Sequence, residues 1–364
     1  MTGQIYFLII LFLFTSLILA FIPYLTRKTE NFGVSIPASL YDRDDFKAMR
    51  KKYMLTLLIV GIFLATVLFI LVPLLSQSVM YIVYTIILLA YIVAAFILYL
   101  PFHFKMKQLK AIDNWQEDRK QSFVVDIKFR QEKLIYSNWW FLTSLIIIIA
   151  TITATLILYD HIPDKIPMHT DISGNVTYEA KSIGNLLFLP GTQVFMLIVF
   201  ICINFVIKNS KQQVSAENPE KSKQQNIIFR RRWSAYLIWT AALTQILIMF
   251  LQLTLIFPTL LTYENTVLFT ITIIIITTTL ILALTTGQGG SRVKVGERSN
   301  ENAIDRDDDR YWKLGQFYFN KNDPAIFIEK RLGVGWTNNW AHPASWTVIG
   351  VIILAIVVPP IFLI

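Results

Sequence analysis

The sequence has little charge and almost no cysteine. Only 16% of its 364 residues are Asp, Glu, Lys or Arg, whereas 55% are hydrophobic. Soluble globular domains carry charge on roughly a quarter of their residues, so this composition excludes an ordinary soluble domain. A single cysteine, Cys202, excludes an intramolecular disulfide and a cysteine metal cluster. Its place within an apolar run predicts a small, buried apolar side chain.

Charge is also missing from the middle of the long apolar runs. Eight runs are long enough to cross the bilayer, because about 30 Å of hydrocarbon takes roughly 20 helical residues. None has Asp, Glu, Lys, Arg or His at its centre, as expected where charge in lipid is costly. We predict an all-α polytopic membrane protein with about eight transmembrane helices and a small cytoplasmic module that contains strands. The runs cover approximately 3–25, 54–76, 79–101, 138–158, 190–207, 234–257, 265–285 and 344–364.

Basic residues are missing before the first run, and the first cations, Arg27 and Lys28, follow it. This order predicts a retained span rather than a cleaved signal peptide. Loop 159–189 holds only two basic residues, whereas 31 of the 33 Lys and Arg lie in alternate loops. By the positive-inside rule we expect these basic loops in the cytoplasm, and loop 159–189 and both termini outside a cell membrane. The four basic loops are 26–53, 102–137, 208–233 and 286–343.

The net charge of +9 is therefore a topology signal. Cations that flank membrane spans face anionic lipid headgroups, so the expected partner is the lipid bilayer and no nucleic acid. Arg230, Arg231 and Arg232 directly precede a span, which predicts juxtamembrane anchoring.

The hydrophilic segments are short, and their composition suggests six parts. Polar, aromatic-poor residues after 208 predict a mobile linker, and charges spaced among apolar residues over 104–135 predict an amphipathic helix. The β-favouring runs YWKLGQFYF and AIFIEKRL, separated by NKNDP, predict a small strand module. The expected parts are a three-helix part with basic loops (1–135), a helix–outer loop–helix unit (136–208), a linker (209–233), a helix pair (234–285), the module (286–343) and a last helix (344–364).

Recognisable catalytic motifs are missing, so we expect no enzyme activity and no cofactor. H-E-x-x-H does not occur, and the glycines of TGQGGSR follow a membrane run, which predicts a flexible exit rather than a P-loop. His161, His169 and Asp171 have metal-ligand chemistry, but their spacing fits no zinc motif and no metal is expected. Two other interpretations of His169 stay open: a backbone hydrogen bond in a tight loop, and recognition of an extracellular ligand.

The outer loop, YDHIPDKIPMHTDISGNVTYEAKSIGNLLFL at 159–189, is the most distinctive stretch. It contains an Ile-Pro step, a Pro-x-His, a glycine five residues later and a lysine beyond it. This pattern resembles the membrane family called domain of unknown function 1648, and it also occurs in bacterial SdpI-type immunity proteins. The resemblance implies that Pro167, His169, Gly174 and Lys181 are the motif and candidate ligand-binding residues, with an extracellular peptide as ligand.

The stretch DDDRYWKLGQFYFNKNDPAIFIEKRLGVGWTNNW at 307–340 resembles a second small family, domain of unknown function 5808, which is often attached to the first. FGVSIP at 32–37 is similar to a step between the early helices of the same proteins. The site residues that the second resemblance implies are Tyr311, Trp312, Gly315, Asn320, Gly333, Gly335 and Trp336.

Together the resemblances imply a multi-pass membrane protein that confers SdpI-like immunity, or signals, against an extracellular peptide or envelope stress. A cytoplasmic regulator would be its second partner. The alternative is a membrane-embedded transporter or metal-dependent enzyme, which would require ionisable groups or broken helices at mid-depth. The runs offer mainly Thr, Asn204, Gln245 and Gln252, and the last two share a helix face, which predicts hydrogen bonds between helices.

Overall fold

The computed structural model describes residues 2–113, 115, 120–122, 129, 132–170, 176–216, 218–296, 303–305 and 308–350. Seven helices in these ranges are long and apolar enough to cross a membrane, so the polytopic helical architecture is confirmed. The eighth expected span is helical over 343–350, and its remainder lies outside the described residues. The seven helices are α1 (Thr2–Leu25), α2 (Asp44–Leu71), α3 (Gln77–Asp113), α4 (Leu142–Ile157), α6 (Phe188–Asn209), α7 (Pro219–Ile256) and α8 (Glu264–Thr286).

The outer surface of the helices is apolar. Ile59, Phe63 and Ile157 are 66%, 65% and 73% exposed, an arrangement that is costly in water and suits contact with lipid tails. Cys202 also lies on this surface, so the prediction of a buried cysteine is wrong. The buried face of α6 is instead formed by residues such as Phe200 and Asn204.

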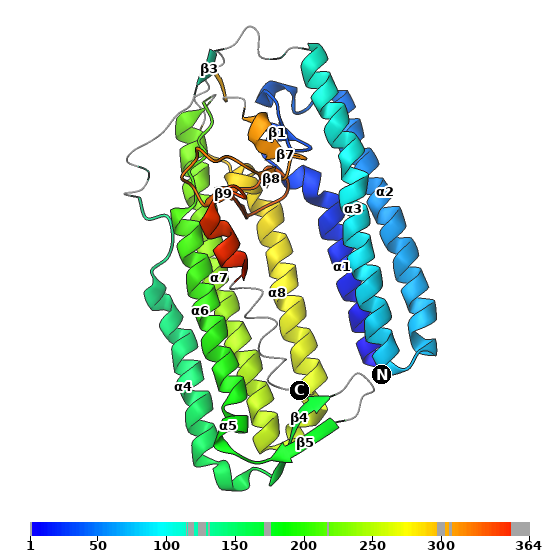
Figure 1. Cartoon of the computed structure of the whole chain (residues 1–364), viewed down its shortest axis with the longest axis vertical. Helices are drawn as coiled ribbons and strands as arrows, with labels where there is room; N and C mark the ends of the chain where they lie inside the picture. Colours follow the sequence, from blue (N-terminus) through cyan, green and yellow to red (C-terminus); the bar gives the residue numbers. More distant parts are fainter. Residues whose placement is uncertain are drawn as a thin grey trace.

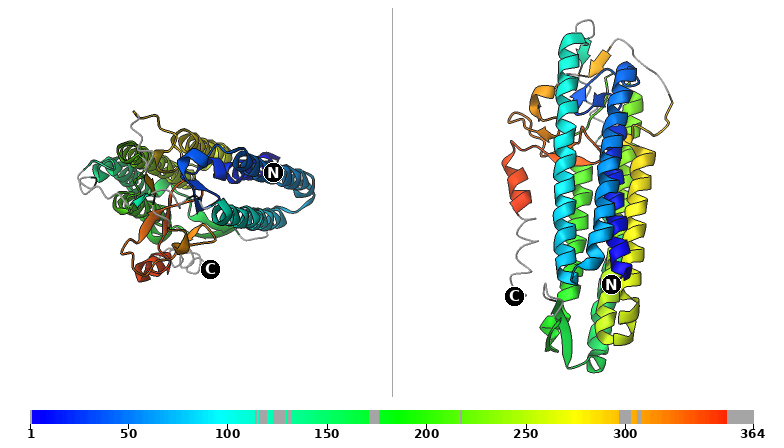
Figure 2. Two further views of the ribbon diagram at one scale, coloured as in Figure 1. Left: turned by 90° about the horizontal axis from the view of Figure 1, so that it is seen from above. Right: turned by 90° about the vertical axis from the view of Figure 1, so that its right-hand side faces the viewer.

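The helices form two groups joined by α8 (Figures 1 and 2). Helices α1, α2 and α3 enclose a core that includes Phe12, Leu57 and Tyr91. Helices α4, α6 and α7 enclose a second core. Helix α8 packs on α7 and also contacts α1, where the rings of Phe7 and Phe269 stack with centroids 4.0 Å apart.

Buried amides connect the second group, as the shared face of Gln245 and Gln252 predicts. Gln193 on α6 and Gln245 on α7 each donate to the other's backbone carbonyl, at 3.0 and 3.2 Å. Gln252 donates to Thr155 Oγ1 on α4 at 3.0 Å and to the Leu186 carbonyl of the short helix α5 (Ile183–Leu186) at 3.1 Å. Such bonds hold apolar helices in a fixed register.

Short strand pairs lie at the two ends of the bundle (Figure 1). One end, the hairpin end, carries the antiparallel pair β4 (Lys165–Thr170) and β5 (Val176–Ala180). The other, the basic end, carries the described parts of all four basic loops. Its strands are β1 (Glu30–Asn31) with β2 (Val34–Ser35), β3 (Lys120–Ser122) with β6 (Ala303–Asp305), β7 (Trp312–Lys313) with β8 (Phe317–Tyr318), and β9 (Phe327–Glu329) with β10 (Trp336–Asn338).

Three expectations for the basic loops differ from the structure. The linker is largely helical, because Asn218 caps α7, accepting a hydrogen bond from the Lys221 N–H, and Pro219 starts the helix. Residues 104–113 continue α3 rather than forming a separate surface helix. The glycine-rich exit from α8 is a buried turn, η7 (Gln288–Gly290), rather than a flexible one.

Candidate functional site

The hairpin β4–β5 carries the motif of loop 159–189, and Lys181 bonds the base of the hairpin to the end of α4. Lys181 Nζ donates to the carbonyls of Ile162 at 3.0 Å and Tyr159 at 3.3 Å, and it lies 4.6 Å from the centroid of the Tyr159 ring. Its side chain is only 14% exposed. Lys181 therefore holds the strand pair against the end of α4, and it does not extend toward a ligand.

The other motif residues lie along the strands. Pro167 is exposed and pairs in register with Tyr178, and His169 pairs with Thr177 after a bulge in β4. His161 is exposed at the end of the 3-10 turn η5 (Tyr159–His161). Gly174 and Asp171 lie outside the described residues. Within the described part of the chain, no group of three His, Cys, Asp or Glu side chains could hold a metal ion.

At the basic end, residues 308–340 fold as a compact unit, here called the module. Trp312, Tyr318 and Ile328 form its small core. Asn339 joins its strands: its side-chain Nδ2 donates to the carbonyls of Asn320 at 2.8 Å and Asp323 at 3.1 Å, while its Oδ1 accepts from the Asn320 N–H at 3.0 Å. The prediction of a small folded strand module is confirmed.

Two left-handed turns dock the module on the first helix group. Gly315, with φ of 70°, lies so close to α3 that an added Cβ would be 2.4 Å from Tyr99 Oη and 2.7 Å from His103 Nδ1. Gly33, with φ of 73°, lies against Gly315 in the same way. Tyr99 Oη donates to the carbonyls of Phe32 at 2.8 Å and Leu314 at 3.1 Å. The FGVSIP step and the module thus meet on Tyr99.

The module also contacts the second helix group and α8. The ring of Trp336 packs 5.1 Å from that of Phe229 on α7, between centroids. The side chain of Gln288 in η7 bonds both backbone groups of Gly335, accepting at 2.8 Å and donating at 3.0 Å. Gly333 and Gly335 have φ of 79° and 118°. Apart from its chain neighbours, no described residue lies within 4 Å of a Cβ added at Gly335, so the backbone conformation rather than crowding requires glycine there.

Buried ion pairs reinforce the contact with the first group. Arg331, 3% exposed at its side chain, pairs with Asp308 and Asp309 and donates to the Gly33 carbonyl at 3.2 Å. Asp309 also accepts from Ser35 Oγ at 2.6 Å and from Lys110 Nζ on α3 at 2.5 Å. These bonds tie the module to loop 26–53 and to α3.

A second buried network joins the module to α6 and α7. Glu329 pairs with Arg27 and with Arg230, and it accepts from Asn226 Nδ2 at 2.6 Å. Arg230 is fully buried and donates to the carbonyls of Ile207 at 2.8 Å and Ser210 at 3.2 Å, the last turn of α6. The interpretation of Arg230 as a lipid-facing anchor is therefore wrong.

A third link connects α6 with the turn before β9. Lys211 pairs with Asp323 at 2.5 Å, and the Lys211 N–H donates to the Phe327 carbonyl at 2.9 Å. Burial alone would raise the pKa of Asp323, but hydrogen bonds from Lys211, the Ala325 N–H and Tyr318 outweigh burial and lower it. Burial raises the pKa of the Tyr318 hydroxyl, which donates to Asp323 at 2.8 Å.

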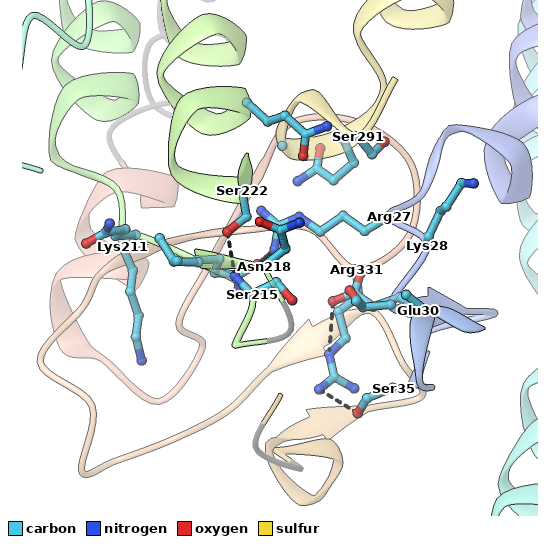
Figure 3. A pocket seen from close by; sticks show the side chains of 18 of the residues that line it. Arg27, Lys28, Glu30, Ser35, Lys211, Ser215, Asn218, Ser222, Ser291 and Arg331 are labelled. Atoms are coloured by element: carbon cyan, nitrogen blue, oxygen red, sulfur yellow. Dashed lines mark hydrogen bonds and ion pairs between the residues drawn. The ribbon is translucent and has the colours of Figure 1, made fainter. Parts of the chain in front are cut away.

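A half-open cavity of about 1280 Å³ lies between these networks (Figure 3). Its walls come from loop 26–39, the start of α7, the turn after α8 and the module. Among the described residues, seven Lys or Arg and three Asp or Glu line it. Of the module residues that the sequence singles out, Tyr311 and Asn320 line this cavity, whereas Trp312, Gly315, Gly335 and Trp336 hold the module in place.

Three buried charged residues of these networks, Arg230, Glu329 and Arg331, were not recognised from the sequence as site residues. One signal was available: Glu329 and Arg331 are two apart at the end of the apolar run AIFI, so a strand would direct both to one face. The partners of that face lie about 100 and 300 residues away in the chain, beyond the reach of local patterns.

Comparison with known families agrees with both motifs, whereas no curated protein and no solved structure matches the chain. The first match starts within α4, spans the hairpin and α5, and ends in the second turn of α6. The second covers the part of the module with β9 and β10. Residues 146–194 thus match the domain of unknown function DUF1648, and residues 321–346 the family of unknown function DUF5808.

Proposed function

We propose that this multi-pass membrane protein is a non-enzymatic receptor. Its hairpin β4–β5 recognises an extracellular agent such as a toxic peptide, and its module contacts a cytoplasmic regulator. The four loops whose described parts lie at the basic end hold 31 of the 33 Lys and Arg of the sequence, which supports a cytoplasmic position of that end. Immunity would follow from capture of the peptide, and signalling from a change at the module.

One observation carries the proposal: the hairpin end and the module are attached to opposite ends of the same two helices. Helix α7 is bonded to α5 through Gln252 and to the module through Arg230. Helix α6 follows α5 directly and contacts β9 through Lys211 just after its last turn. A shift of the hairpin base would therefore displace helices whose other ends contact the module.

The charge pattern of the bundle favours a receptor over a transporter. From 233 to 256, α7 carries no ionisable side chain apart from Tyr236, and its buried glutamines bond neighbouring helices. Transport pathways typically place ionisable groups or broken helices at mid-depth.

A tethering experiment tests the coupling. In a Cys202→Ser background, biotin–maleimide on Tyr178→Cys would carry streptavidin as a macromolecular load, because Tyr178 is 59% exposed on the hairpin. We expect this load to change amide hydrogen exchange over 326–340. Leu74→Cys, 77% exposed at the same end of the first helix group, is the matched control and should leave that exchange unchanged. Unchanged exchange with the Tyr178 tether would contradict the proposal.

A further inference from the structure

We propose that the cavity at the basic end binds an anion that carries phosphate groups. Four separate segments form its walls: loop 26–39, residues 211–225, residues 288–296 and the module. At about 1280 Å³ it has room for a small organic ligand, because such pockets usually measure about 300–1,000 Å³.

The charge on the walls selects a multiply charged anion. Among the described residues, seven Lys or Arg and three carboxylates line the cavity, an excess of four positive charges on its walls, and one of these cations, Arg27, also pairs with Glu329. Lys294 forms no ion pair within the described part of the chain, and the described bonds of Arg292 are to the carbonyls of Leu284 and Tyr24. One carboxylate ligand would neutralise a single charge, whereas each phosphate monoester group carries about −1.5 to −2.

The polar groups on the walls are of the kinds that bind phosphate. The first turn of the 38-residue helix α7 opens on the cavity with Asn218, Lys221 and Ser222. A helix N-terminus carries partial positive charge, which favours a bound anion. The N–H groups of Lys221 and Ser222 are already bonded to Asn218, so this charge and the side chains of the first turn, rather than free backbone donors, suit an anion here. Ser291 and Gly289 border the cavity after α8.

Gly289 is also needed for the shape of the wall. Its φ is 59°, and an added Cβ would lie 2.6 Å from both Nε and Nη2 of Arg27. The Arg27 guanidinium therefore lies directly over the glycine backbone, and it also pairs with Glu329. Figure 3 shows Arg27 among the side chains that line the cavity. A side chain at 289 would displace a cation of the wall.

The phosphate could belong to a soluble compound or to a lipid headgroup, since the cavity lies where α1 and α8 end. Two arms distinguish these sources for the purified full chain. In phosphatidylcholine nanodiscs, pyrophosphate is titrated at constant ionic strength. In a second set without pyrophosphate, phosphatidic acid, whose headgroup is a phosphate monoester, replaces part of the phosphatidylcholine. The midpoint of thermal unfolding is measured in both, because a ligand that binds the folded state raises it.

We expect stabilisation in at least one arm, by pyrophosphate for a soluble ligand or by phosphatidic acid for a headgroup. In the arm that shows stabilisation, the double variant Lys221→Gln, Lys294→Gln should raise the ligand concentration needed for half of the maximal effect about tenfold or more. The reason is that charge-assisted bonds to phosphate are lost. Lys105→Gln is the matched control, an exposed lysine of the basic end that does not line the cavity. If the double variant does not fold, Lys294→Gln alone provides the test, because Lys294 is exposed.

Stabilisation in neither arm would overturn the proposal. The proposal would also be overturned if the ligand stabilised the wild type and the lysine variants equally. It would likewise be overturned if Lys105→Gln lost as much of the stabilisation as the double variant, because the ligand would then be attracted to the basic surface as a whole. None of these results depends on the hairpin, so this site and the receptor proposal can fail separately.

Discussion

Arg230 and Glu329 form an ion pair with 3.3 Å between Nη2 and Oε1, and both side chains are fully buried. The arginine belongs to α7 and the glutamate to β9, so the pair joins the membrane bundle to the module. Arg230 also binds the last carbonyls of α6. One guanidinium therefore fixes the positions of two helices and a strand.

Removing one partner of this pair should be strongly destabilising. Glu329→Ala leaves Arg230 buried without its carboxylate, for which the typical cost is about 3–5 kcal/mol. We expect a clear fall in the midpoint of thermal unfolding in detergent. Replacing both partners by apolar residues, Arg230→Met with Glu329→Leu, should lose less than Glu329→Ala. If Glu329→Ala lowered the unfolding midpoint no more than Glu132→Ala at an exposed position, the Arg230–Glu329 pair would not stabilise the attachment of the module.

Gly315→Ala should detach the module from the first helix group. Its φ of 70° strains any other residue, and the added Cβ would overlap Tyr99 Oη. We expect a loss of more than about 1 kcal/mol and faster proteolysis within 308–340. Gly184→Ala is the control, because its nearest contact would be 3.9 Å away. Equal proteolysis of the two variants would show that the contact with Tyr99 is unimportant.

Gln252→Leu should loosen the hairpin end. The amide donates to Thr155 Oγ1 and to the Leu186 carbonyl, and interhelical bonds of this kind contribute about 0.6–2 kcal/mol. We expect faster amide exchange over 176–186. Thr244→Val on the same helix is the control, because the Thr244 hydroxyl bonds only the Thr240 carbonyl of α7 itself. If Gln252→Leu left amide exchange over 176–186 unchanged, the bonds of Gln252 would not be what holds the hairpin end on α7.

Acid should weaken the link between Lys211 and Asp323. The pKa of Asp323 is lowered in the folded state, so its contribution to stability is complete above the ordinary carboxyl pKa of about 4 and is lost below it. Asp323→Asn should therefore lower the unfolding midpoint at pH 7, and the difference from wild type should shrink as the pH falls below about 4. A difference from wild type that does not change with pH would show that the carboxylate charge of Asp323 is unimportant.

Features that depend on local sequence were predictable, and those that depend on distant pairing were not. The spans follow from apolar length, and the bonding of Gln245 and Gln252 follows from helical spacing. The start of α7 was also signalled, since Asn218, Pro219 and Glu220 form a capped first turn, but the polar composition of the segment outweighed that signal. The burial of Arg230 could not be predicted, because a charge is buried only where its partner folds against it, and Glu329 lies 99 residues away.

The central claim is that the hairpin and the module lie on opposite sides of the membrane, with the hairpin outside. Its most direct test is labelling of intact cells with an impermeant maleimide in a Cys202→Ser background. Tyr178→Cys lies on the exposed hairpin, and Lys313→Cys on an exposed position of the module. We expect labelling at 178 in intact cells, and at 313 only after the membrane is permeabilised. Labelling at 313 with protection at 178 would contradict the receptor account.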